Sequence, residues 1–582
     1  MSLLTIGLSG LRTTRDALGV TSNNVANSNN PAYRKQLLKQ ASGLSQLASG
    51  GYVGQGVKSV ELTRVTNDFL YNQVLKTGSQ AAYSGTLANQ LSRIDDLFAQ
   101  GSNRLTEAMT QFNNASEDLT LRPTDLPARQ NYLGQAAFLV DQFNTVGNRL
   151  ESIRQDNNTQ IALKIDEINS LTSNLARLNK SISQEVAAGH GGNLPLNLLD
   201  QRDDLVLQLS EQVDVQILEG ARGELNVFMR NGQSLVSGER AFNLVAVADA
   251  QDAENLTIAR DPGEGQGELI RFATKNLGRG ELSGLLEFRD GALSQYQNTL
   301  GLMAVRFAEQ VNTLQTQGYD LDDNLGQDLF SFASSVSDPN DNGISKVVGN
   351  AFNSNAIAAQ VTNLESATLS TPEFELFGVD NGAGGVEVRY RALGSKGAGI
   401  AVTDLGGGQL QVPGAFTLSI TSGVFNIGDS LQVKTTVNAA QNLRLNLLTA
   451  EQVATRAAFD ASGAPITPTE LNRGDATQIR KVTSVLSQPS MYVRPNGQGV
   501  SIQNAFSRFL TVVGNDVSAA KDSQQASNNV LDKLSAEQSA VSGVNLDEEA
   551  AALIQFQQAY NANAKIISLS KELFEDLLSA IR

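Results

Sequence analysis

The chain contains no cysteine, no tryptophan and a single histidine, His190, among 582 residues. The absence of cysteine excludes disulfides, zinc–thiolate sites and thiol nucleophiles. The histidine lies in Gly189-His190-Gly191-Gly192, and no G-x-S-x-G elbow accompanies it. We therefore interpret this segment as a loop rather than as part of a catalytic triad. Aromatic residues make up only 5% of the chain.

Clustered positive charge and long apolar runs are also missing. The formal net charge is −16, whereas a nucleic-acid site needs clustered lysine and arginine. The chain has no run of about 18 apolar residues, so we predict no membrane span. The first residues, MSLLTIGLSG, lack the basic region and the continuous apolar core of a signal peptide. We predict neither a nucleic-acid nor a membrane partner, and no cleaved signal.

Apolar residues recur every seven positions at both ends of the chain. The N-terminal stripe consists of Leu4, Leu11, Leu18 and Val25, with Leu8 at an intermediate position. The C-terminal stripe consists of Leu546, Leu553, Tyr560, Ile567, Phe574 and Ile581, with Phe556 and Leu577 at intermediate positions. A seven-residue repeat on a helix makes a surface that another helix covers. We predict that the two stripes pair and that their residues form an assembly interface.

Polar residues interrupt both stripes. These residues are Arg15 and Ser22 in the first, and Glu549, Asn563 and Ser570 in the second. Such positions set register and copy number at a cost in stability. Each buried leucine contributes roughly 1.5–3 kcal/mol, and ordering each residue costs roughly 1–2 kcal/mol. We hypothesise that the paired termini become fully ordered only among neighbouring subunits. An ordinary intramolecular bundle is the alternative.

The chain between the stripes combines long helices with a β-rich insert. Apolar residues spaced by three and four predict one very long helix, or two joined, between Pro127 and Pro195, and a shorter helix from Leu87 to Phe112. A helix of about 55 residues would reach about 80 Å. Residues 500–582 read as two helices that break near Ser542. Alternating residues predict a hairpin at 213–227 and strands at 386–390, 416–420 and 431–433.

These patterns predict an α+β multidomain fold with a helical foot and a β-rich head. We assign residues 1–40 with 543–582 to the paired terminal helices. Residues 41–330 with 471–542 form a long-helix bundle that includes a small β element near 213–275. Residues 331–470 form a β-rich inserted outer domain.

The candidate metal and acid sites each have a simpler interpretation. Asp338 to Gly343 matches the first half of a calcium loop, but its twelfth position is Gly349 instead of glutamate. This run and the aspartates at 320–323 are typical of turns. The pairs Asp203-Asp204 and Glu548-Glu549 lie on expected helices, where adjacent side chains point about 100° apart. We predict no catalytic, cofactor-binding or metal-binding residue.

Three motifs resemble a known family. The segment Asn23-Asn24-Val25-Ala26-Asn27-Ser28-Asn29-Asn30-Pro31-Ala32-Tyr33-Arg34 resembles the N-terminal signature of the axial proteins of the bacterial flagellum, which usually have glycine where Ala32 stands. The segment from Ser542 to Ala551, followed by Phe556-Gln557-Gln558-Ala559-Tyr560, is similar to the hook-associated protein 1 family, the first hook–filament junction proteins. The segment from Leu198 to Asp203 resembles an internal part of that family. The likeness covers roughly residues 1–215 and 473–582.

The resemblance implies a structural protein without enzymatic activity. It implies export unfolded through the flagellar type III channel to the cell exterior, and a ring of copies between the hook protein and the second junction protein. It also implies an export chaperone at the C-terminal helix, with Phe556, Tyr560, Ile567 and Phe574 as candidate anchors. Within the N-terminal signature, the motif residues are Asn23, Asn24, Val25, Ala26, Asn27, Pro31 and Tyr33.

Three other functions stay open at the level of the sequence. The chain could be a different axial protein, such as a hook or distal rod subunit. Its β-rich insert could also carry a hydrolase acting on surface glycans, or an adhesin-like binding surface.

Overall fold

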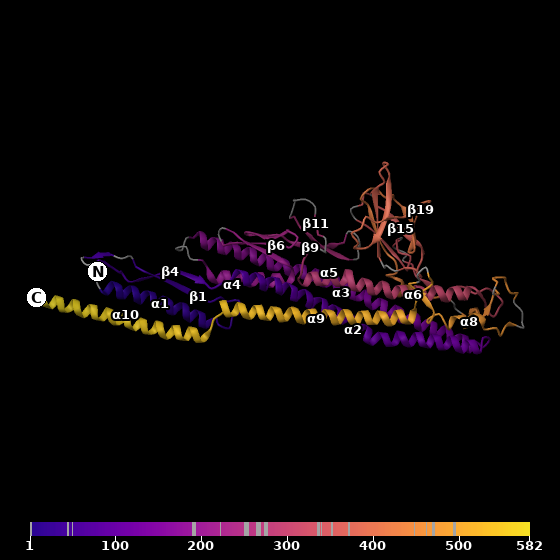
Figure 1. Cartoon of the computed structure of the whole chain (residues 1–582), viewed down its shortest axis with the longest axis horizontal. Coiled ribbons are helices and arrows are strands. Elements are labelled where there is room, and N and C mark those ends of the chain that lie inside the picture. Colours follow the sequence, from indigo (N-terminus) through magenta and orange to yellow (C-terminus); the bar gives the residue numbers. More distant parts are fainter. Residues whose placement is uncertain are drawn as a thin grey trace.

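The protein is elongated, and both chain termini lie at the same end of it (Figure 1). The computed structural model describes residues 3–43, 46–48, 51–188, 194–220, 223–249, 255–262, 269–272, 277–334, 338, 340–350, 353–354, 356–369, 373–446, 449–460, 462–467, 472–492 and 496–581. His190 lies outside these residues.

Long helices build the body of the molecule. They are α2 (Asp68–Leu121), α3 (Leu126–Ala187), α6 (Ser294–Thr316) and α9 (Ile502–Ser542), and the shorter α4 (Leu196–Gln212) and α5 (Glu281–Glu287) lie beside them. A π-helical turn, Phe288–Leu293, joins α5 to α6. Asn67, Asp125 and Ser501 cap α2, α3 and α9, because each side chain accepts a hydrogen bond from a backbone N–H three residues later.

The long helix expected between the two prolines is confirmed as a single helix, α3, of 62 residues. Helix α2 begins well before the expected Leu87, because Leu70, Val74 and Leu75 are already buried on it. The break expected near Ser542 is also confirmed, since α9 ends there and α10 (Leu546–Ile581) follows.

Large aromatic side chains fill the core of the body. The rings of Phe98 on α2 and Phe509 on α9 pack edge to face with centroids 5.0 Å apart. Phe112 on α2 and Phe307 on α6 do the same at 5.2 Å, and Tyr132 on α3 is fully buried beside Phe112. Burying such rings dominates the energetics of a core. The body therefore has the hydrophobic core of a stable domain.

Two small antiparallel sheets cover one side of α3 and α4. The first has the order β5-β6-β7-β8 and the second β11-β10-β9. Their strands are β5 (Val215–Glu219), β6 (Leu225–Met229), β7 (Ser234–Ser237), β8 (Arg240–Ala241), β9 (Leu244–Ala248), β10 (Leu256–Arg260) and β11 (Ile270–Arg271). Strands β5 and β6 confirm the hairpin expected from the alternation.

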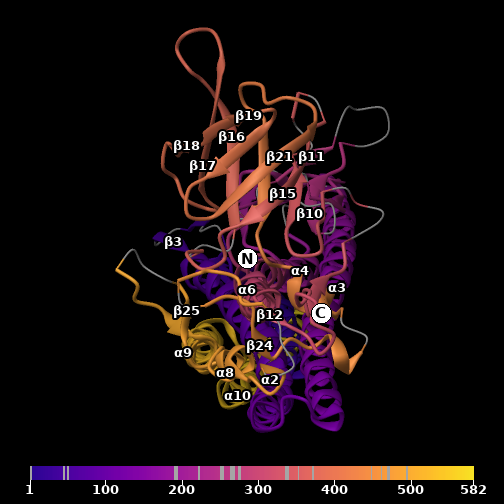
Figure 2. The same ribbon diagram turned by 90° about the vertical axis from the view of Figure 1, so that its right-hand side faces the viewer.

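The head is a pair of antiparallel sheets that projects sideways from the body (Figures 1 and 2). The sheets have the orders β14-β22-β16-β17-β18 and β15-β21-β20-β19. Their strands are β14 (Lys346–Gly349), β15 (Ala358–Leu364), β16 (Glu373–Asp380), β17 (Val386–Ala392), β18 (Ile400–Ala401), β19 (Thr403–Gly406), β20 (Gln409–Val412), β21 (Phe416–Ser422) and β22 (Ser430–Lys434). Phe374 and Phe416 meet between the sheets with centroids 5.3 Å apart.

Short elements connect the head to the body. They are β12 (Gly318–Tyr319), β13 (Phe330–Phe332), α7 (Ala439–Asn442), β23 (Leu443–Leu445), a 3₁₀ turn (Ala450–Gln452), β24 (Arg456–Ala457), α8 (Thr477–Val482), β25 (Pro489–Met491) and β26 (Val500–Ser501). Glu373 of the head accepts hydrogen bonds from Asn298 of α6 and from Gln432 of β22. Buried polar contacts therefore fix the head on the body.

The aspartate-rich segments form turns, as the sequence analysis expected. The Asp338 carboxylate accepts a hydrogen bond from the N–H of Asn340, and that of Asp341 from the N–H of Gly343. Asp323 forms an ion pair of 2.6 Å with Arg456. Among the described residues, no three His, Asp or Glu side chains are grouped to hold a metal ion, and no described helix is long and apolar enough to cross a membrane.

Candidate functional site

The terminal helices α1 (Leu3–Ala26) and α10 pair side by side in opposite directions. Asn24 lies opposite Glu549, and Gly10 lies opposite Asn563. The hairpin formed by β1 (Gln36–Ser42) and β4 (Val57–Arg64) lies against α1, and β2 (Gln46–Ala48) pairs with β3 (Gly51–Val53) between them. We call α1, this hairpin and α10 the foot. Strand β1 spans the proposed domain boundary at residue 40, and the domain limits stay a prediction.

Helix α1 contacts α10 through small side chains. Its buried positions include Gly7, Gly10, Thr14, Ala17, Thr21 and Asn24, spaced alternately by three and four residues. A Cβ atom on Gly10 would overlap the side chain of Asn563, and one on Gly7 would lie 3.0 Å from Cγ1 of Ile567. The two helices therefore approach too closely at these glycines for a larger residue.

The N-terminal stripe is not buried as the contact between the helices is. Leu4 and Leu8 are 46% and 39% exposed, and Leu11, Leu18 and Val25 are half-buried. Gly7, Gly10, Ala17 and Asn24 each directly precede an apolar residue of the stripe, and adjacent residues point about 100° apart on a helix. The expected intramolecular pairing of Leu4 and Leu8 with the C-terminal stripe is wrong, because the small residues allow a closer approach.

The C-terminal stripe is only partly covered. Leu553, Phe556, Tyr560 and Ile567 are half-buried, whereas Leu546 and Phe574 are exposed. The side chains of Leu577 and Ile581 lie outside the described part of the chain. The polar residues that interrupt the stripe lie on the covered side of α10: Glu549 is buried, and Asn563 and Ser570 are half-buried.

Asn24 fixes the register of the two helices. Its Nδ2 donates hydrogen bonds to Oε2 of Glu549 and to the carbonyl of Gln36, both at 3.0 Å. Its Oδ1 accepts from the Tyr33 hydroxyl at 2.8 Å and from the N–H of Gln36 at 3.1 Å. An amide side chain that uses all four of its hydrogen bonds while buried tolerates no shift of its partners.

The rest of the motif supports this arrangement. Asn23 donates to the Tyr33 hydroxyl at 3.1 Å, and burial raises the pKa of Tyr33 to about 12. Asn27 donates from its side chain to the carbonyl of Asn23. Ala26 ends α1 and is exposed, as is Pro31 in the following turn. The motif therefore builds the turn that leaves α1.

Lys35 ties this turn to the connection between α9 and α10. Its N–H donates to the carbonyl of Ser542 at 2.9 Å, and its Nζ lies 2.8 Å from Glu548 and 3.1 Å from Glu549. Burial lowers the pKa of Lys35, but the hydrogen bonds to both glutamates outweigh it and the pKa is raised. The same contact lowers the pKa of Glu548. We call this set of contacts the elbow.

A buried ionic cluster joins the foot to the body. Nη1 of Arg64 on β4 lies 2.8 Å from Asp200 and 3.0 Å from Asp203 of α4. Arg202 also pairs with Asp203 at 2.9 Å, and the Tyr71 hydroxyl donates to the carbonyl of Asp203 at 2.8 Å. Removing one partner of such a cluster leaves a buried charge uncompensated, so the cluster holds the hairpin firmly on α4.

Burial and charge pairing shift the pKa values of the cluster in opposite directions. Burial lowers the pKa of Arg64, yet Asp203 and Asp200 outweigh this and the pKa is raised. Burial raises the pKa of Asp200 against the effect of Arg64. The sequence analysis missed this cluster, although a signal was present: Asp203 shares the three- and four-residue spacing of Leu196, Leu199 and Val206, which are all buried.

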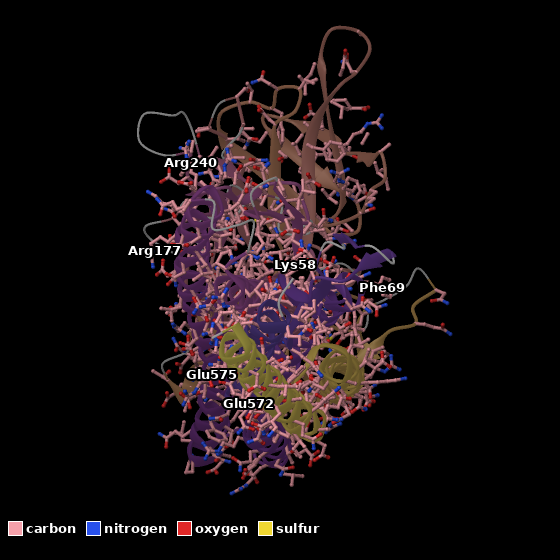
Figure 3. The ribbon with its side chains drawn as sticks, turned by 90° about the vertical axis from the view of Figure 1, so that its left-hand side faces the viewer. Lys58, Phe69, Arg177, Arg240, Glu572 and Glu575 are labelled. Carbon is pink, nitrogen blue, oxygen red and sulfur yellow. The ribbon has the colours of Figure 1, made fainter. Side chains whose placement is uncertain are left out.

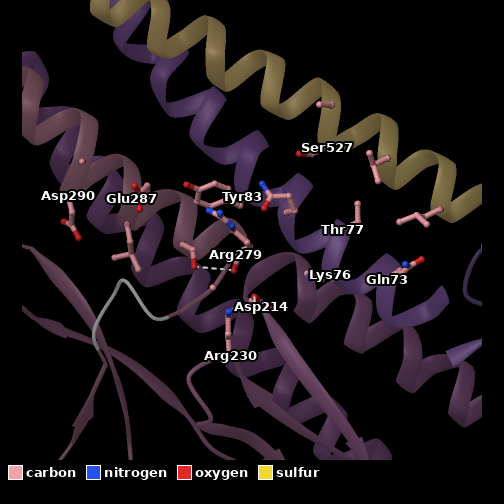
Figure 4. A pocket seen from close by; sticks show the side chains of 18 residues that line it. Gln73, Lys76, Thr77, Tyr83, Asp214, Arg230, Arg279, Glu287, Asp290 and Ser527 are labelled. Carbon is pink, nitrogen blue, oxygen red and sulfur yellow. Dashed lines mark hydrogen bonds and ion pairs between the residues drawn. The ribbon is translucent and has the colours of Figure 1, made fainter. Parts of the chain in front are cut away.

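A groove of about 1270 Å³ lies between α2, α9 and residues 278–291, which include α5 (Figure 4). Its charges are mixed: Asp214 pairs with Arg230 at 3.4 Å, and the Arg279 guanidinium lies over the ring of Tyr83, 4.5 Å from its centroid. Burial, and then the nearby Glu287, raise the pKa of Tyr83.

Comparisons with known proteins match both the body and the C-terminal helix of the foot. Residues 91–330 match the family model described as the flagellar hook-associated protein FlgK helical domain, and residues 538–580 match the flagellar basal body rod FlgEFG protein C-terminal model. The chain is 32% identical to flagellar hook-associated protein 1 of Salmonella typhimurium over 580 residues, which cover 99% of each chain. The corresponding protein of Escherichia coli is 30% identical over 579 residues, again 99% of each chain.

The chain belongs to the flagellar hook-associated protein 1 family. Members of this family are structural proteins of the flagellar hook–filament junction. The fold is also that of the flagellar hook junction protein FlgK from Burkholderia pseudomallei, with a TM-score of 0.66 and 20% identity over 81% of this chain and 100% of that one. The match to the rod-protein model covers residues 538–580, which include nearly all of α10 and the elbow residues Ser542, Glu548 and Glu549.

Proposed function

We propose that this chain is a structural subunit that connects the flagellar hook to the filament, and that the foot is the part that assembles. The observation that carries this proposal is the distribution of large apolar side chains. The foot leaves exposed Leu3, Leu4, Leu8, Leu37, Val60, Leu546, Ile554, Ile566, Leu569, Leu573 and Phe574. Apolar surface gathered in one region marks an interaction site.

The foot gains hydrophobic stabilisation when neighbouring copies cover it. The contact between α1 and α10 buries glycine, threonine and alanine, which contribute little transfer free energy. Each leucine or phenylalanine that becomes covered on assembly contributes roughly 1.5–3 kcal/mol. Copies that cover each other's N-terminal stripes thus supply the core that an isolated foot lacks.

The remaining expectations are part of the same proposal. Copies form a ring between the hook protein and the second junction protein, outside the cell. An export chaperone covers the exposed side of α10, including Phe574, before assembly. No catalytic activity is needed for any of these steps.

Complementation of a deletion strain tests the proposal. We expect Leu4→Asp/Leu8→Asp to be exported but to give cells that have hooks, lack filaments and shed flagellin into the medium. Leu163→Asp is a matched control, since Leu163 is 61% exposed on α3 of the body, and it should leave filaments intact. Normal filaments with the doubly substituted foot would contradict the proposal.

A further inference from the structure

The charges of the foot are divided between its two chain segments. Residues 1–66 contain seven lysines and arginines and two acidic residues, a net charge of +5 in a chain whose net charge is −16. Helix α10 contains Asp547, Glu548, Glu549, Glu572, Glu575 and Asp576 against Lys565 and Lys571. The foot is thus basic on one segment and acidic on the other.

The end of α10 extends past its partner helix. Gly7 of α1 lies beside Ile566 and Ile567, so in the antiparallel pair Leu3 lies near position 570. We call residues 571–581 the α10 tip. In Figure 1 this tip projects beyond α1 at the end of the molecule. Leu573 and Phe574 are exposed on it, and a helix end without tertiary contacts is marginal in water.

The charge of the α10 tip also calls for a partner. Glu572, Glu575 and Asp576 are all exposed on the tip, where Lys571 is the one described cation. The one ion pair there, among the described residues, is between Lys571 and Glu575 at 3.7 Å, with both side chains exposed. A basic surface with apolar neighbours would satisfy both the charges and the exposed rings of the tip.

The foot presents such a surface on α1 and β4. The N–H of Val57 donates to Oγ of Ser9, and the hydroxyl of Ser59 contacts Asp16. Because β4 runs along α1 in this way, Lys58 lies beside the turn of α1 that carries Arg12. Both side chains are exposed, and no described acidic side chain pairs with either. We call Arg12 and Lys58, together with the exposed Leu8 one turn before Arg12 and Val60 two residues after Lys58, the basic strip.

The α10 tip cannot reach the basic strip of its own chain. Gly10 lies opposite Asn563, so Arg12 lies opposite about position 561. Glu572 is then about 16 Å farther along the helix, at about 1.5 Å per residue. Figure 3 views the foot end on and shows Lys58 apart from Glu572 and Glu575 of α10.

We propose that the α10 tip of one copy docks on the basic strip of the next copy. The acidic side chains face Arg12 and Lys58, and Leu573 and Phe574 cover Leu8 and Val60. The contact joins two different patches, so it is head-to-tail and repeats from copy to copy around a ring or along a helix. It rests on the proposed assembly of the foot and assigns the surfaces that meet.

Charge complementarity of this kind mainly sets register and the rate of encounter, while the apolar contacts supply affinity. Reversing one side should therefore prevent docking, and reversing both should restore it. This restoration separates a direct contact from a general loss of stability.

The first test is a charge exchange in the full chain, read as filaments per cell in a deletion strain. We expect Glu572→Lys/Glu575→Lys/Asp576→Lys, and separately Arg12→Glu/Lys58→Glu, to lower filament number at least tenfold. All five substitutions together should restore it to within about twofold. Asp532→Lys/Glu537→Lys, on the exposed part of α9, is the control and should have no effect.

The second test uses the natural absence of cysteine. Lys58→Cys/Glu575→Cys should form covalent multimers when flagella are oxidised, and Asp532→Cys/Glu575→Cys should not. Multimers from the first pair support the proposal even if the charge reversals impair export. Failure of both restoration and cross-linking overturns it.

The assembly role of the foot and the contact between the α10 tip and the basic strip can be refuted separately. If Leu4→Asp/Leu8→Asp blocks filaments but neither test above succeeds, the foot assembles through other surfaces and only the assigned contact is wrong. If the substituted stripe leaves filaments intact, the assembly role of the foot is wrong as well.

Discussion

The body and the foot are both helical, but they bury opposite kinds of residues. The body encloses Phe112, Phe143, Tyr296 and Phe307 completely. At the contact of α1 with α10 the foot buries glycine, threonine, alanine, Asn24 and Glu549, whereas its described leucines are half-buried or exposed. The body therefore has a core of its own, whereas the foot has a precise contact without a large core.

This difference separates two tasks within one chain. Close packing of small residues and the Asn24 hydrogen bonds fix how α1 and α10 sit against each other. The outward leucines stay available for other molecules. Stability of the isolated chain should depend on the body, and assembly should depend on the foot.

The largest expected effect on stability comes from removing a large side chain from the core of the body. Phe307→Ala should lower the free energy of unfolding by about 3–5 kcal/mol, because it removes a fully buried ring and leaves a cavity. Leu8→Ala, at an exposed position of the foot, should change it by less than about 0.5 kcal/mol. Urea unfolding followed by circular dichroism measures both. Equal losses would remove the distinction between the two regions.

The next effect concerns the cluster that joins the regions. Arg64→Met should cost about 3 kcal/mol, because it leaves Asp200 without its cation in a buried site. Asp200→Asn added to Arg64→Met should recover part of this loss. Thermal unfolding of the single and double variants measures the coupling, and simple additivity would show that the two side chains do not interact.

A smaller effect is expected at the contact of the terminal helices. Gly10→Ala should destabilise the foot by about 1–3 kcal/mol, since the added methyl group overlaps Asn563. Gly19→Ala should instead stabilise α1 by about 0.5–1 kcal/mol, because no atom lies within 4 Å of its Cβ position. Hydrogen exchange of α1 amides distinguishes the two variants. Slower exchange in both would show that α1 does not approach α10 closely at Gly10.

The smallest effect is the pH dependence of the elbow. The pKa of Glu548 is held below its ordinary 4.5, and that of Lys35 above 10.5. Their ion pair should thus contribute constantly between these values, and be lost as the pH falls through the lowered pKa of Glu548 or rises through the raised pKa of Lys35. Exchange of elbow amides, corrected for intrinsic rates, should increase below pH 4.5. Lys35→Met should abolish this step, and a step that persists would have another origin.

Much of the fold follows from local patterns in the sequence. Periodicity located α3, the break at Ser542, and the strands β5, β17, β21 and β22, because each pattern is long or lies between clear turn residues. The start of α2 was missed, since Gly78, Gly85 and a mixed composition hide a helix whose burial comes from α9 and α4.

The site was harder to predict than the fold. The heptads identified the helices that pair, but they favoured the leucine face over Gly7, Gly10 and Ala17. Apolar periodicity reports hydrophobicity and carries no information on how closely two helices approach. Glu549 and Asn563 looked like interruptions of a stripe and are instead contact residues. The cluster of Arg64 with Asp200 depends on two segments far apart in the chain, which no local pattern brings together.

Accessibility of a single thiol at Leu8 tests the central claim most directly. Leu8→Cys in the cysteine-free chain should react rapidly with a maleimide in the monomer and become at least tenfold slower in assembled flagella. Leu163→Cys on the body should react in both. A Leu8→Cys thiol that stays equally reactive after assembly would contradict the claim that neighbouring subunits cover the foot.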